Sequence, residues 1–149
     1  MQLTEHFTLE EATASATAAA HGINNQPPSD GIRFNIQKTA QQMEQVRSLL
    51  GNNPIRVSSW FRCDEVNALV GGVANSAHAK GLAVDFTCPD FGSILDVCHA
   101  IEQSDIQFDQ LIWEFGSWVH IGFCNCPQPR RQILTIHKGG NYINGLPSA

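Results

Sequence analysis

Two histidines and an aspartate stand at spacings that could hold a metal ion. His78 precedes Asp85 by seven residues, and His120 lies in a later apolar segment. By spacing alone the three could be unrelated side chains. Together, however, two imidazole nitrogens and one carboxylate oxygen make a three-ligand set, as in catalytic zinc sites with a fourth position open for water. The cysteines are not spaced to supply a fourth protein ligand, so the pattern favours a catalytic site over a closed structural one.

Strand alternation gives a physical reason for two of these ligands to meet. The segments 82–87 and 118–123 are predicted strands, and successive side chains of a strand point to opposite faces. Asp85 and His120 then each occupy the middle of the less apolar face, while the other face packs on helices. If the strands pair with these faces aligned, the two side chains converge. Gly81 permits the tight turn that would bring His78 over the sheet.

The remaining pattern predicts a single α+β domain over residues 1–149, with a small, mostly antiparallel sheet and helices on one face. Thr8 is a candidate helix cap, and the alanine-rich stretch after it predicts one helix as far as Ala20. Further helices and strands follow from the spacing of apolar residues. The expected helices are 32–50, 63–70 and 91–103, and the expected strands are 55–58, 82–87, 108–115, 118–123 and 132–137. The tail from Lys138 is expected to be irregular.

Composition excludes several classes of function. The net charge is −5 and the basic residues are scattered, so the chain lacks the basic stripe that a nucleic acid requires. No apolar stretch approaches the length of a membrane span, and the N-terminus has no secretory signal. We therefore expect synthesis in the cytoplasm, no membrane insertion and a monomer. Five cysteines leave at least one thiol unpaired in a monomer, and thiols in a reducing compartment are the simplest interpretation. Of the other histidines, His99 and His137 are expected to be structural, and His6 and His21 are expected to take no part in the site.

Several motifs resemble those of the M15 peptidases, which are zinc D-Ala-D-Ala carboxypeptidases and related phage endolysins, relatives of the Hedgehog signalling domain. The resemblance rests first on a Ser-x-His motif followed by Asp85, and on the later Trp-Val-His strand. It extends to Ile55-Arg-Val-Ser-Ser-Trp-Phe-Arg62 and to the front segments 7–11 and 21–25. It implies a Hedgehog or D-Ala-D-Ala peptidase-like fold. It also implies Zn²⁺ held by His78, Asp85 and His120, with a zinc-bound water as nucleophile.

The resemblance also implies residues that contact the substrate. Arg62 matches an arginine that supports the substrate carbonyl or carboxylate, for which a planar guanidinium is suited; without the motif it would be a solvated loop residue. Ser76 is expected to bind substrate or orient the site, although a loop cap is the alternative. Trp118 stands where members of the wider superfamily have a histidine, and we expect it to contact substrate.

The general base is the least regular part of the resemblance. Many M15 members place a glutamate three residues before the last histidine ligand, where this chain has Ser117. Glu114 lies six residues before His120, a spacing similar to that of the Hedgehog domain. A hairpin through residues 115–117 would fold Glu114 back beside His120. We therefore predict Glu114 as the base, with an ordinary strand-end carboxylate as the alternative.

These expectations combine into a zinc peptidase that hydrolyses a peptide bond in peptidoglycan stem peptides. It would be a D,D-carboxypeptidase or endopeptidase, or an L-Ala-D-Glu endopeptidase; the sequence does not distinguish these bonds. A cytoplasmic product without a signal would reach the periplasmic wall only if released, as a phage or prophage endolysin is. The alternative is a zinc-containing module that binds cell wall or protein without catalysis.

Overall fold

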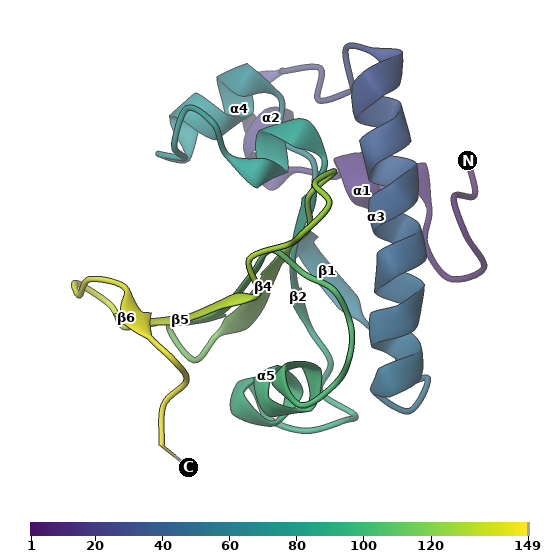
Figure 1. Cartoon of the computed structure of the whole chain (residues 1–149). Coiled ribbons are helices and arrows are strands. Elements are labelled where there is room, and N and C mark those ends of the chain that lie inside the picture. The colour runs from purple at the N-terminus through teal and green to yellow at the C-terminus, as the bar shows by residue number, and fades with distance from the viewer. Residues whose placement is uncertain (149) are drawn as a thin grey trace. The chain divides into compact units, whose positions relative to one another are not determined.

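The computed structural model describes residues 1–148 and confirms the α+β class (Figure 1). Helices dominate the front of the chain and most strands follow. In chain order the elements of these residues are α1 (Leu9–Thr13), α2 (Ala16–His21), α3 (Asp30–Leu49), β1 (Arg56–Ser59), α4 (Asp64–Leu69), the 3-10 helix η1 (Ala77–Lys80), β2 (Ala83–Thr87), α5 (Ile94–Glu102), β3 (Gln110–Glu114), β4 (Trp118–Gly122), β5 (Gln132–Ile136) and β6 (Ile143–Asn144).

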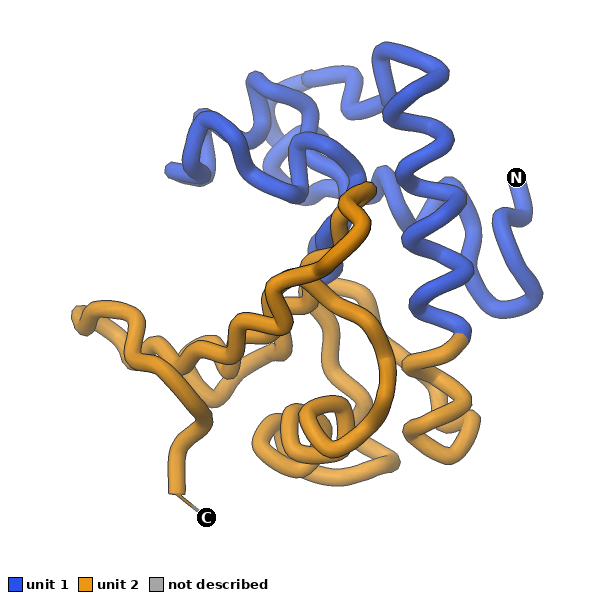
Figure 2. The backbone as a smooth tube through the Cα atoms, in the orientation of Figure 1, with its two compact units in different colours: residues 1–44, 59–84 blue, residues 45–58, 85–149 orange. Residues whose placement is uncertain are grey.

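The chain forms two compact units (Figure 2). Unit 1 contains residues 1–44 and 59–84, and unit 2 contains residues 45–58 and the chain from Asp85 onward. The single domain expected over residues 1–149 stays a prediction, and residue 149 lies outside the described residues. Within residues 1–148, no helix combines the length and the apolar character that a membrane crossing needs.

The front of unit 1 holds two short helices where the sequence predicted one, and this prediction was wrong. Thr8 caps α1 as expected, because its hydroxyl accepts a hydrogen bond from the Glu11 N–H at 3.1 Å. The helix then stops at Ala14, whose backbone is extended. The Ser15 hydroxyl accepts from the Ala18 N–H at 3.1 Å and starts α2. A serine favours capping over a helix interior because its hydroxyl competes for backbone N–H groups.

The long helix α3 has the apolar stripe that the sequence predicted. Its buried side chains follow helical spacing and are fully excluded from solvent: Ile36, Ala40, Met43 and Val46, with Leu50 immediately after the helix. Burying such side chains supplies the main favourable free energy of folding. The predicted helix at 32–50 is therefore confirmed, with its start two residues earlier.

The turn before β2 is as tight as the glycine suggested. Gly81 has a φ of +74°, and a Cβ atom there would lie 2.7 Å from Cγ1 of Ile36. The Thr39 hydroxyl donates a hydrogen bond to the Gly81 carbonyl at 2.9 Å. Only glycine adopts this conformation at no steric cost and leaves room for the helix. The segment before Gly81, predicted as a loop, forms η1.

The six strands lie in the order β1-β2-β4-β3-β5-β6. β3 pairs antiparallel with β4 and parallel with β5, so the sheet is mixed. α5 packs against β3 and β4, and the side chains of Leu111, Val119 and Ile121 are fully buried. This is the apolar face that alternation predicted for 118–123. The tail, expected to be irregular, adds β6 through an antiparallel pair with β5.

Candidate metal and catalytic site

His78 is fixed by its own backbone and by one carbonyl. It lies in η1, where its N–H donates to the Ser76 hydroxyl at 3.2 Å. Its ring Nδ1 lies 2.7 Å from the Trp60 carbonyl oxygen. Since a carbonyl can only accept, Nδ1 carries the hydrogen and Nε2 keeps the lone pair. Histidine ligands of metals are commonly oriented by such a hydrogen bond, and only 3% of His78 is exposed.

Arg62 belongs to the same unit and is tied to η1. Its backbone N–H donates to the His78 carbonyl at 3.1 Å. One guanidinium nitrogen, Nη2, lies 3.4 Å from the Ser76 hydroxyl. Ser76 therefore caps η1 and also contacts Arg62; its expected role toward the substrate or the site stays a prediction. These two contacts join the segment after β1, which carries Arg62, to the segment before β2, which carries Ser76 and His78.

Asn25 holds the backbone on both sides of Arg62, and the sequence did not predict this role. Its amide nitrogen donates to the Phe61 carbonyl at 3.0 Å and to the Thr13 carbonyl at 2.9 Å. Its amide oxygen accepts from the Cys63 N–H at 2.8 Å. The side chain is buried, so each of these hydrogen bonds satisfies a group that water does not reach. The only signal was its place in the family-like segment 21–25.

In unit 2, Asp85 and His120 meet as the alternation argument predicted. Each lies at the middle of its strand, β2 and β4. Oδ1 of Asp85 and Nδ1 of His120 are 2.9 Å apart. Both side chains are buried, with 9% of Asp85 and 8% of His120 exposed. The carboxylate can only accept, so Nδ1 of His120 donates in this contact; the two atoms can act together as metal ligands once that hydrogen is exchanged for the ion.

Glu114 reaches His120 through the predicted hairpin. Phe115 and Gly116 both have positive φ, 60° and 66°, and the Ser117 N–H closes the turn on the Glu114 carbonyl at 2.9 Å. The β3–β4 register places Glu114 on the same face as His120. Oε1 of Glu114 lies 3.8 Å from Nδ1 of His120. The carboxylate is therefore beside a candidate ligand atom.

Trp118 is the cross-strand partner of Glu114 and shares that face. Its ring packs edge-on against Phe115, with ring centroids 5.3 Å apart. Phe115 is a bulky residue in the left-handed region, a conformation that costs free energy and recurs near functional sites. The ring contact helps to stabilise the turn that carries Glu114.

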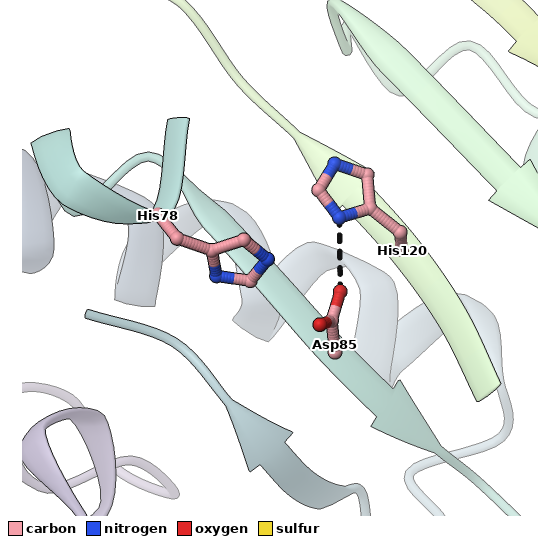
Figure 3. Close-up of side chains that lie close together, drawn as sticks. All are labelled: His78, Asp85 and His120. Carbon is pink, nitrogen blue, oxygen red and sulfur yellow. Dashed lines mark hydrogen bonds and ion pairs between the residues drawn. The ribbon is translucent and has the colours of Figure 1, made fainter. Parts of the chain in front are cut away.

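His78, Asp85 and His120 form a group suited to a metal ion (Figure 3). One ligand atom from each residue lies within 4.8 Å of the others. The lone pair of His78 Nε2, the nitrogen of His120 and the carboxylate of Asp85 are the donor types that zinc prefers. The donor types of the three residues therefore fit a zinc ion.

The other histidines make different contacts. Nδ1 of His6 lies 2.8 Å from Glu44, and Nδ1 of His99 lies 3.4 Å from Glu102. The ring of His137 packs edge-on against a tryptophan. His21 ends α2 and is exposed.

Two of the cysteines are paired, which the simplest sequence interpretation did not expect. Cys124 and Cys126 form a disulfide just after β4. Among the described residues, Cys63, Cys88 and Cys98 are free thiols. Burial, the main cause, raises the pKa of Cys98 to about 12, so this thiol is a structural residue. Cys124 and Cys126 also group with Asp109, but the carboxylate of Asp109 already binds the guanidinium of an arginine.

Comparison with known proteins bears on the same residues. A family model described as Peptidase M15 matches residues 5–122, which include α1 through β4 and all three candidate ligands. No curated protein matches the sequence. The match covers well over half of the chain, and it agrees with the motifs around His78, Asp85 and His120. The chain therefore belongs to the Peptidase M15 family.

Proposed function

We propose that this M15 peptidase is a zinc enzyme that hydrolyses a peptide bond in peptidoglycan stem peptides. The bond is that of a D,D-carboxypeptidase or endopeptidase, or of an L-Ala-D-Glu endopeptidase. The observation that carries the proposal is the His78–Asp85–His120 group with Glu114 beside it. Such a donor set with an adjacent carboxylate is the minimum that metal-assisted hydrolysis needs.

The three ligands have distinct duties. His78 offers Nε2 because its Nδ1–H is engaged by the Trp60 carbonyl. Asp85 supplies one negative charge, which reduces the net positive charge of the site when the ion is bound. Zinc, when bound, lowers the pKa of a water molecule and polarises a carbonyl. The protein contributes three ligands whose side chains are buried, with between 3% and 9% of each residue exposed.

Glu114 is the proposed general base. A base must lie within reach of the proton that it takes. The Glu114 carboxylate lies 3.8 Å from Nδ1 of His120, so a water held beside these ligands is within one hydrogen bond of it. Its proton passes to Glu114 as the oxygen attacks the carbonyl carbon, and Glu114 then delivers it to the departing amine.

Arg62 is the proposed partner of the substrate oxygen. Its charge would stabilise either the oxyanion that develops on the scissile carbonyl or the terminal carboxylate of the peptide. Ser76 is within 3.4 Å of its Nη2 and limits the directions that the guanidinium takes. Asn25 holds the backbone on either side. Trp118 offers an apolar surface next to Glu114.

The test uses purified sacculi and mass spectrometry of the released peptides. Zinc-loaded protein should release peptides, chelation should stop the release, and added zinc should restore it. The masses identify the bond. His78→Ala should lose both zinc and activity. The matched control His99→Ala, a half-exposed histidine on α5, should keep both.

Two outcomes would reject the proposal. Undiminished release after chelation, with no zinc in the protein, would exclude metal-assisted hydrolysis. One equivalent of zinc without any released peptide would instead identify a zinc-containing binding module.

A further inference from the structure

The edge strand β6 brings one tyrosine to the sheet beside the candidate site. β5 and β6 pair antiparallel, with Thr135 opposite Ile143 and Leu134 opposite Asn144. Tyr142 immediately precedes β6, and the same register continued by one residue places it opposite Ile136. Figure 1 shows β6 next to β5 at the end of the sheet. Residues 132–144 lie outside the part of the chain that the family model matches, 5–122.

The register of the whole row puts this tyrosine on the face that carries the site. Ile136 is opposite Glu114 in the parallel β3–β5 pair, and Glu114 is opposite Trp118 in the β3–β4 pair. Directly opposed residues point to the same face of a sheet. Tyr142, Ile136, Glu114 and Trp118 therefore form one transverse row, and His120, two residues after Trp118, shares their face.

Two hydrogen bonds of Gly145, just after β6, support this register. The Gly145 N–H donates to the Ile133 carbonyl at 2.8 Å. The Thr135 hydroxyl donates to the Gly145 carbonyl at 2.7 Å. A slip of β6 by one residue would move Tyr142 to the opposite face, and these two hydrogen bonds oppose such a slip.

The electrostatic surroundings of Tyr142 agree with its place in the row. Burial first, and then the negative charges of Glu114 and Asp85, raise the pKa of the Tyr142 phenol. The hydroxyl therefore keeps its proton at neutral pH and is available as a donor. Although part of the ring is covered, 58% of the residue is exposed, so a ligand lying along this face can reach it.

We propose that Tyr142 is a substrate-binding residue, whose hydroxyl donates a hydrogen bond to a carbonyl or carboxylate oxygen of a peptide lying across Glu114. This inference rests on the proposed function, because it assigns a contact for the same peptide substrate. The acceptor must be a substrate oxygen on the side of Glu114 toward β6, since β3 lies between β4 and β5. The sheet would thus extend the binding surface beyond the residues of the family match.

Tyr142→Phe removes the hydroxyl and keeps the ring. With a synthetic stem pentapeptide, we expect kcat/KM to fall roughly 3- to 30-fold, as for the loss of one hydrogen bond to a polar or charged group. The loss should be in KM, with kcat within about twofold, because the contact exists in the bound substrate as well as in the transition state. Zinc content should not change. The control Ile143→Ala alters the exposed neighbour on the other face and should leave KM unchanged.

A second measurement reads the contact without catalysis. Tyr142 is the only tyrosine of the chain, so tyrosine labelled only at the ring carbon that bears the hydroxyl gives a single NMR signal. Adding the stem pentapeptide to the zinc-loaded Glu114→Gln variant should shift that signal. Peptide binding with an unmoved signal, or an unchanged KM in Tyr142→Phe, would overturn the inference while leaving the peptidase intact. Failure of the unaltered protein to release peptides from sacculi would instead defeat the proposed function.

Discussion

Glu114→Gln isolates the proton-accepting role of one carboxylate. Glutamine has nearly the same shape as glutamate, but its amide cannot accept a proton at neutral pH. The hairpin that positions the side chain is made by backbone groups, namely the Ser117 N–H and the Glu114 carbonyl. Those groups are unaltered by the substitution, so the variant should fold and keep its side chain near His120.

The expected loss follows from what a positioned base contributes. General base catalysis supplies about 10²- to 10⁴-fold in rate, which is about 2.7 to 5.4 kcal/mol at 1.36 kcal/mol per tenfold. Oε1 of Glu114 is 3.8 Å from a candidate ligand atom of His120, so the carboxylate also helps to orient the site. Loss of such a supporting group weakens metal binding by about 10- to 100-fold. Excess zinc separates this effect from the loss of the base.

The assay compares peptide release from sacculi at saturating zinc with the zinc content of the same samples. We expect kcat to fall by about 10²- to 10⁴-fold while one equivalent of zinc remains. Glu102→Gln, on the surface of α5 next to His99, is the matched control and should retain full rate.

A Glu114→Gln protein with full activity would refute the assignment of the base. Loss of zinc at every concentration tested would also refute the reasoning, because it would make Glu114 a determinant of metal binding and not the acceptor of a proton.

Three further substitutions test how the site is supported. Gly81→Ala should destabilise the protein by more than the roughly 1–2 kcal/mol that a left-handed non-glycine residue costs, because the added Cβ would lie 2.7 Å from a side-chain atom of α3. Gly71→Ala is the control, since Gly71 also has a positive φ but has nothing within 4 Å of an added Cβ. In urea unfolding this control should lose only the free energy of the left-handed conformation. Asn25→Ala should lower the unfolding free energy by about 2–4 kcal/mol and impair activity, whereas the exposed Asn24→Ala should change stability by less than about 0.5 kcal/mol. The hydrogen bond from the bound arginine lowers the pKa of Asp109. The ion pair therefore contributes at most about 1 kcal/mol to stability, which is present above the unfolded pKa and is lost as pH falls through the lowered folded pKa. Asp109→Asn should remove this part of the loss of stability in acid, and an unchanged dependence of stability on acidic pH would contradict the prediction.

Local periodicity accounts for much of what the sequence predicted correctly. The alternation of 118–123 fixed which face of β4 is apolar, and the helical spacing of 36–50 fixed the buried side of α3. These are properties of a few consecutive residues, because side-chain direction follows directly from backbone geometry. The break at Ser15 was missed because alanine-rich flanks have high helix propensity, while the cap that interrupts them is a single hydroxyl.

For the candidate site, too, local sequence determined some features and contacts between distant segments determined others. The sequence alone determined that Asp85 and His120 sit mid-strand and that Gly81 turns the chain before them. Which strands are neighbours, and in what register, depends on contacts between segments far apart in the chain. The hairpin expected at residues 115–117 already brought Glu114 toward His120, but only the tertiary structure decided their separation of 3.8 Å, the contacts of Asn25 beside Arg62, and the return of the tail as β6. The physical reason is that a one-residue change of register reverses the face of every side chain, and no local pattern in the tail specifies that register.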